Sequence, residues 1–197
     1  TLGAAVPNGT VNEQDAGVFA TSHVEGTRGT VEFTDFSFEA LRDTELLSVD
    51  VTDSGDATFD IGSDSYTIEA AGHDVWTDAD EYGALYEPDQ SGDIVAETTI
   101  ESQEDTHDWA KTGLMMANDI TDAGSSPGDV IVAATPANGF IMDWDEDGDG
   151  YISTHNEDGS VSYPCHLRLR RSDGEYTGEY STDGGRNWTT LASTTID

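Results

Sequence analysis

Apolar and polar residues alternate along most of this chain, which is the pattern of strands with one buried face. In the segment 29–38, Val31 and Phe33 fall on one face, and Phe36 and Phe38 follow after a change of phase. A β-bulge produces such a change, because one extra residue turns the following side chains to the other face. Helical periodicity is scarce, so we predict an all-β protein.

Further strands are predicted downstream. Residues 94–101 also alternate, and residues 130–134 form a nearly all-apolar run that is typical of a central strand buried on both faces. Turn sequences rich in Gly and Asp occur at 172–174 and 181–185. Many short strands with such turns predict an antiparallel β-sandwich or jelly roll. Residues 39–53 fit either an added strand or a linker between domains.

The charge of the chain is extreme. It has 41 acidic and 7 basic residues, for a net charge of −34. This much like charge strains a compact fold in dilute buffer, whereas molar salt screens it beyond a Debye length of about 3 Å. The acids are dispersed and 35% of the residues are hydrophobic, so a core is expected. We therefore predict a halophilic protein, and the lack of a basic patch argues against nucleic acid as a partner.

The cellular location is indicated only weakly by the sequence. The single cysteine, Cys165, cannot form an internal disulfide, and no apolar run is long enough to span a bilayer. Asn8 and Asn187 each begin a glycosylation sequon, which favours an extracellular or cell-surface location.

The segment 143–157 carries the most specific motif. Asp145, Asp147 and Asp149 alternate and are followed by Gly150, as in the first half of an EF-hand calcium loop. The flanking residues do not predict helices, so we expect the loop at a β-hairpin tip binding one Ca²⁺; a solvated acidic turn is the alternative. The candidate metal ligands are Asp143, Asp145, Asp147, Asp149, Tyr151, Asn156 and Glu157.

Aromatic residues are the candidates for sugar contacts. Trp144 stands between loop aspartates, where it would contact a glycan beside the calcium or pack the base of the hairpin. Four further aromatic residues could form a platform that stacks on a sugar, but we expect them to pack in the core. They are Trp76, Tyr82, Tyr86 and Trp109.

No catalytic constellation is evident, and we predict that the chain is not an enzyme. The glucanase strand motif Glu-x-Asp-x-x-Glu is absent. The five histidines are scattered, and surface or hydrogen-bonded roles are expected for them. Lys111, the only lysine, is expected to pair with a carboxylate in the sheet.

Several segments resemble a known family. These include His-Asp-Val-Trp-Thr-Asp at 73–78, Trp-Ala-Lys-Thr-Gly-Leu-Met-Met at 109–116 and Leu-Arg-Leu-Arg-Arg at 167–171. In order, over about residues 54–197, they are similar to concanavalin A-like β-sandwich modules of the "regulation of enolase" kind. The resemblance implies a concanavalin A-like jelly roll and, with the acidity, a haloarchaeal cell-surface repeat protein. It implies no defined activity, and it does not include the calcium loop.

The N-terminal strands are out of the family's order. Residues 17–38 resemble the final strands of these modules, yet they precede the body at 54–197. Residues 1–38 would thus complete the sandwich of their own chain, complete that of a neighbouring subunit by strand exchange, or belong to a cut tandem array.

These observations predict a non-catalytic, calcium-stabilised building block of a halophilic surface protein or fibre. It is expected to self-associate, with strand exchange between subunits as one route. A carbohydrate-binding, lectin-like module is the alternative, and an enzyme ranks third.

Overall fold

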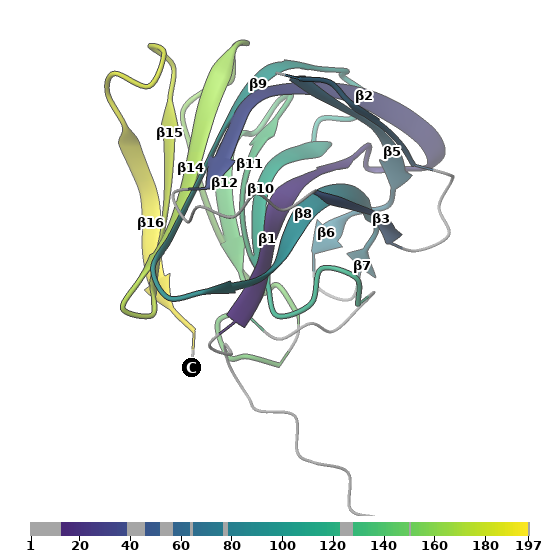
Figure 1. Cartoon of the computed structure of the whole chain (residues 1–197). Helices are drawn as coiled ribbons and strands as arrows, with labels where there is room; N and C mark the ends of the chain where they lie inside the picture. The colour runs from purple at the N-terminus through teal and green to yellow at the C-terminus, as the bar shows by residue number, and fades with distance from the viewer. Residues whose placement is uncertain are drawn as a thin grey trace, which may run out of the picture.

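The computed structural model describes residues 13–38, 46–51, 57–63, 65–76, 79–122, 128–149 and 151–196. Over these residues the protein is all-β, and two seven-stranded antiparallel sheets pack face to face (Figure 1). The predicted fold class, an antiparallel β-sandwich, is confirmed. Within the described part of the chain, no helix of a length and hydropathy suited to crossing a bilayer is found.

Sheet I carries the candidate site described below. Its strands, in spatial order, are β13 (Thr154–Asp158), β12 (Gly139–Trp144), β11 (Val130–Thr135), β10 (Lys111–Ala117), β1 (Glu13–Thr21), β8 (Tyr82–Ser91) and β3 (Leu47–Val51).

Sheet II packs against sheet I. Its strands, in spatial order, are β16 (Thr189–Thr195), β15 (Glu175–Ser181), β14 (Cys165–Ser172), β9 (Ile94–Gln103), β2 (Val24–Phe38), β5 (Ser65–Gly72) and β4 (Thr58–Ile61). A separate short hairpin consists of β6 (Val75–Trp76) and β7 (Ala79–Asp80).

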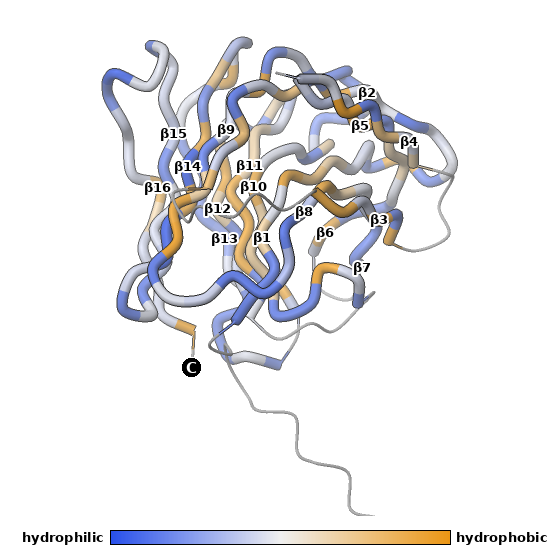
Figure 2. The backbone as a smooth tube through the Cα atoms, viewed as in Figure 1, coloured by the Kyte–Doolittle hydropathy of each residue, from blue (hydrophilic) through white to orange (hydrophobic). Residues whose placement is uncertain are grey.

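The main core lies between the two sheets. Its largest members, including Phe33, Ile68, Leu114 and Tyr176, have no solvent exposure. Burying each such side chain contributes about 1.5–3 kcal/mol, so this layer makes a large favourable contribution to folding. Figure 2 shows the apolar residues concentrated along the central strands.

A second apolar layer covers the outer face of sheet I. Phe19, Met115, Ile131 and Ile141 point away from the main core and pack with residues of the connecting segments, such as Ile120. The centre of sheet I is therefore buried on both faces, and every residue of β10, β11 and β12 is buried. This confirms the expectation of a central strand at 130–134.

The predicted phase change in the segment 29–38 is a real irregularity of β2. The register of β2 against β9 shifts between Glu32 and Phe33 and again between Thr34 and Ser37. Asp35, inside the second shift, has a φ of 53°, a left-handed conformation that a regular strand does not contain.

The N-terminal strands close the sandwich of their own chain. β1 lies between β8 and β10 in sheet I, and β2 lies between β5 and β9 in sheet II (Figure 1). Gln14 of β1 also accepts hydrogen bonds from Arg171 Nη1 at 2.6 Å and from the Tyr176 hydroxyl at 2.5 Å. Within the single chain, β1 and β2 therefore hold the positions that the first of the three arrangements requires, and exchange with a neighbouring subunit stays a prediction. Of residues 39–53, those of β3 form an added edge strand, whereas 39–45 and 52–53 lie outside the described residues.

Candidate functional site

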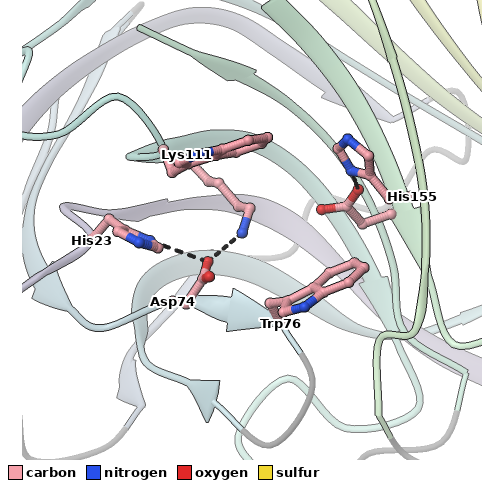
Figure 3. Close-up of a pocket in the computed structure, with 7 residues that line it drawn as sticks. His23, Asp74, Trp76, Lys111 and His155 are labelled. Carbon is pink, nitrogen blue, oxygen red and sulfur yellow. Dashed lines mark hydrogen bonds and ion pairs between the residues drawn. The ribbon is translucent and has the colours of Figure 1, made fainter. Parts of the chain in front are cut away.

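A cavity of about 330 Å³ lies at the outer face of sheet I. Strands of sheet I and the segments that cover its outer face each contribute side chains to the cavity (Figure 3). The lining residues are His23, Asp74, Trp76, Trp109, Lys111, Asp143 and His155.

Strand alternation places Asp143 and His155 on this face. Phe140 and Met142 of β12 point into the main core, so Ile141 and Asp143 point outward. His155 of β13 stands directly opposite Asp143 in the antiparallel pair, and residues opposite one another share a face.

Asp143 and His155 form a hydrogen-bonded pair. His155 Nδ1 lies 2.6 Å from Asp143 Oδ1, and the Asp143 side chain is only 1% exposed. Burial raises the pKa of the Asp143 carboxyl, although the hydrogen bond to His155 opposes this effect. The same hydrogen bond raises the pKa of His155. Asp143 Oδ2 is buried and has no hydrogen-bond partner, so it is an unused acceptor in the wall of the cavity.

Lys111 and Asp74 form a second charged pair. The Lys111 side chain is 4% exposed, and its ammonium group donates to Asp74 Oδ1 and, at 3.3 Å, to the carbonyl of Val75. His23 Nδ1 lies 3.4 Å from the same Asp74 oxygen, on the side away from His155 (Figure 3). Burial lowers the pKa of His23. The predicted pairing of Lys111 with a carboxylate is confirmed, but Asp74 directly precedes β6 and is not part of a sheet strand.

The two tryptophans of the cavity both contact His155. The Trp76 ring meets the imidazole edge-on at 6.1 Å between centroids, and the Trp109 ring does so at 5.8 Å. Packing in the core was expected for both tryptophans. Trp76 does pack against the outer apolar layer of sheet I, but both side chains are only partly buried and line the cavity. For Tyr82 and Tyr86, which are 3% and 7% exposed, core packing is confirmed.

The predicted calcium loop joins β12 to β13, so its expected place at a hairpin tip is confirmed. Carboxylate oxygens of Asp145, Asp147 and Asp149 all lie within 4.8 Å of one another. Ca²⁺ binds oxygens at about 2.3–2.6 Å, so oxygens this far apart fit around one ion. Asp145 is buried and accepts backbone N–H bonds from Gly128 at 3.2 Å and Gly148 at 2.9 Å. These bonds fix its orientation.

Asp143, Asn156 and Glu157 do not join this cluster, and a role for the Tyr151 carbonyl stays a prediction. Asp143 is engaged with His155 on the outer face of sheet I. Asn156 and Glu157 lie in β13, opposite Met142 and Ile141, because the strand runs away from the tip after Thr154 pairs with Trp144. Tyr151 lies in the loop with its side chain 39% exposed, and its backbone N–H donates to Asp149 Oδ1 at 3.0 Å. Gly150 lies outside the described residues.

The remaining candidates are the possible glycan contact, Trp144, and the two glycosylation sequons. Trp144 is 8% exposed and packs in the main core, so it offers no ring face to a sugar and serves as packing at the base of the hairpin. Asn187 is exposed between β15 and β16, where a sequon is accessible. Asn8 lies outside the described residues.

No protein-family model, curated protein or solved structure shows significant similarity to this chain. The function of the chain is therefore inferred from the geometry of the cavity.

Proposed function

We propose that the chain is a non-catalytic, carbohydrate-binding β-sandwich module of an extracellular halophilic protein, and that the cavity on sheet I is its glycan site. The observation that supports this most strongly is the combination of two tryptophans with the unused, buried Asp143 Oδ2 in one cavity. Small-molecule sites in general combine aromatic walls with a few polar groups that fix orientation.

The tryptophans suit the apolar face of a sugar ring. A pyranose exposes C–H groups on one face, and these pack on the flat indole without a hydrogen-bonding requirement. Trp76 and Trp109 contact the same imidazole, so both rings border one part of the cavity.

The polar groups suit sugar hydroxyls. A hydroxyl donates one hydrogen bond and accepts others, so it can donate to Asp143 Oδ2 while a neighbouring hydroxyl accepts from the Lys111 ammonium. A buried acceptor left without a partner costs roughly 1–3 kcal/mol, which a ligand hydroxyl would recover on binding. An anionic sugar is disfavoured, because it would approach Asp143 and Asp74 in a protein of net charge −34.

A binding role is favoured over hydrolysis because both acids of the cavity already have basic partners. Asp143 is held by His155 and Asp74 by Lys111. In this arrangement each carboxylate is fixed as an acceptor, whereas hydrolysis needs a pair of acids acting on the two sides of a glycosidic bond.

Calcium belongs to the same proposal. Asp145, Asp147 and Asp149 fit Ca²⁺, which would supply positive charge among three carboxylates and fasten the hairpin that carries Asp143 and His155. An ion that binds only the folded state stabilises it.

A building block of a surface array is the second candidate. Leu47 and Ile61 are 45% and 51% exposed, and they lie on β3 and β4, the edge strands at one end of the two sheets. Exposed apolar edges favour association with another copy. Strand exchange has less support, because β1 and β2 occupy internal positions in their own sheets.

Binding is tested by calorimetry in molar KCl, with a panel of neutral, amino and uronic acid oligosaccharides selected on a glycan array. We expect a neutral glycan to bind, Trp109→Ala and Asp143→Asn to weaken it at least tenfold, and Trp188→Ala on sheet II to leave it unchanged. Glycan binding that is unaffected by both cavity substitutions, or no binding by any member of the array, would contradict the proposal. Hydrolysis of the glycan would contradict the non-catalytic role.

A further inference from the structure

Three histidines stack at one end of the glycan cavity. His23 lies on the side away from His155 (Figure 3), and its ring is nearly parallel to the rings of His107 and His73. The ring centroids are 4.3 Å apart for His23 and His107 and 5.8 Å apart for His23 and His73. His23 lines the cavity, whereas the other two residues are exposed, so the stack connects the cavity to solvent.

Three chain segments meet to form this stack. The central histidine lies in the tight turn between β1 and β2. The Thr106 hydroxyl donates to the Ser22 carbonyl at 2.7 Å, which ties that turn to the segment carrying His107. His73 directly follows Gly72, the last residue of β5, which pairs with β2. The backbone therefore holds the three rings close together.

His107 anchors the backbone of Trp109, one of the two cavity tryptophans. The Trp109 N–H donates to His107 Nδ1 at 3.1 Å, and the Ala110 N–H donates to the His107 carbonyl at 2.9 Å. An imidazole nitrogen accepts a hydrogen bond only when it carries no proton, so this arrangement requires neutral His107 with its proton on Nε2. Protonation of Nδ1 would set two N–H groups against each other, and the anchor of Trp109 would be lost.

The groups that face His23 limit how many protons the stack can hold. Asp74 Oδ1 lies 3.4 Å from His23 Nδ1 and also accepts from the Lys111 ammonium. Burial lowers the pKa of His23; Asp74 opposes this effect, and the charges of His107 and Lys111 add to it. Two imidazolium rings with centroids 4.3 Å apart repel one another. The rings should therefore separate when both His23 and His107 are charged.

The other charged groups of these segments are carboxylates. Glu81 Oε2 accepts from the His73 N–H at 2.7 Å, and Glu104, Asp105 and Asp108 lie on the segment between β9 and β10. The last three are exposed, so molar salt weakens their influence on the imidazoles. Their charge favours proton uptake by the exposed rings as the pH falls.

We propose that this histidine stack is a pH sensor, which lowers the affinity of the cavity for a neutral glycan as the pH falls below neutrality. Protonation of His107 releases the Trp109 backbone, and repulsion from His23 separates the rings, so the Trp109 indole leaves its position in the cavity wall. This regulation rests on the proposed glycan-binding function, since it acts on the same site. A neutral glycan has no titratable group, so the pH dependence belongs to the protein.

The first test measures glycan affinity by calorimetry in molar KCl at pH 8 and pH 5, a range that spans the ordinary histidine pKa of about 6.5. We expect the unaltered protein to bind a neutral oligosaccharide at least tenfold more weakly at pH 5. His107→Asn should have nearly equal affinities at the two pH values, because the asparagine Oδ1 can accept from the Trp109 N–H and does not titrate. His166→Gln, a matched change in the sheet II cavity, should keep the tenfold decrease.

The second test needs no glycan, so it separates failure of the sensor from failure of glycan binding. ¹H–¹⁵N NMR spectra follow the backbone and indole N–H resonances of Trp109 between pH 8 and pH 5, in His155→Gln protein so that the other histidine in contact with Trp109 does not titrate. We expect both resonances to shift, and the further substitution His107→Asn to keep them fixed. A shift without binding of any oligosaccharide would support the sensor and contradict the glycan site. Absence of the shift, or an equal shift or equal loss of affinity in the His107→Asn protein, would overturn the proposal.

Discussion

The outer faces of the two sheets differ in how far their charged side chains are exposed to water. In β14 of sheet II, buried and partly exposed residues alternate. Arg168 and Arg170, whose side chains are 21% and 44% exposed, pair with Glu179, and Arg168 also reaches Glu97, so these cations remain in contact with water. In β12 of sheet I every residue is buried, including Asp143. A charged group under an apolar layer interacts strongly with its partner and with a ligand, whereas water weakens a surface pair.

A cavity on each sheet shows the same contrast in how charged side chains are placed. The cavity on sheet II, about 460 Å³, is larger than that on sheet I. However, the Arg168 guanidinium lies over the Trp188 ring at 4.1 Å and covers the face that a sugar would use. Trp76 and Trp109 have no such cation over them in the described residues, and they border an acceptor that needs a ligand. Volume alone therefore does not identify the site.

Lowering the salt concentration should have the largest effect on stability. It also tests whether the two sheets unfold as one cooperative unit. Dialysis into dilute buffer should unfold the protein, because a net charge of −34 is then unscreened. Far-UV and near-UV circular dichroism should lose signal together. Retention of the native spectra at low ionic strength would show that the fold does not need screening.

The Lys111–Asp74 and Arg168–Glu179 ion pairs should contribute different amounts to the free energy of unfolding. Lys111→Met leaves Asp74, which is 16% exposed, without its main cation, and should cost about 3–5 kcal/mol of unfolding free energy. Arg168→Met should cost less than Lys111→Met, because the Arg168 side chain is 21% exposed and Glu179 keeps Arg170 as a partner at 3.0 Å. Urea denaturation in molar KCl gives both values. Equal costs would remove the distinction between the faces.

Chelation should destabilise the side of the molecule that carries sheet I. EDTA should lower the melting temperature at fixed high salt, by an amount equivalent to about 2.7 kcal/mol if free Ca²⁺ had stood at a hundred times Kd for one site. Asp147→Ala should remove the share that belongs to the loop. Identical melting curves with and without chelator would reject calcium at the hairpin.

Raising the pH should have a smaller effect on stability. The hydrogen bond to Asp143 raises the pKa of folded His155 above the ordinary value of 6.5. The resulting stabilisation is complete below pH 6.5 and is lost as the pH rises through the folded pKa. Melting temperatures between pH 6 and 9 should therefore fall more in the unaltered protein than in His155→Gln. Parallel curves would mean that the pair does not titrate in this range.

The fold was predictable because its signals are local. The phase change around Phe33 and Phe36 predicted the irregularity in β2, and the apolar run at 130–134 predicted a strand buried on both faces. Asp143 was noticed, but its spacing to Asp145 indicated a calcium ligand. Its alternation with Met142 was the better signal, since it places Asp143 on the outer face of sheet I.

The partners in the cavity were not predictable, because they come from distant parts of the chain. His155 meets Asp143 through the register of β12 with β13, which the sequence does not specify. Asp74 and Lys111 are 37 residues apart, and His23 reaches them from the end of β1. Trp76 and Trp109 lie outside the strands of sheets I and II, where alternation says nothing about side-chain direction.

The link from Gln14 to Arg171 and Tyr176 has a consequence for biosynthesis. β1 leaves the ribosome before the strands that flank it in the middle of sheet I, and its buried glutamine must wait for partners 157 and 162 residues later. Contacts over such separations form slowly, since a long loop must close before they stabilise anything. The nascent protein should therefore remain protease-sensitive until β15 has emerged, and only then should it fold, in a single late step.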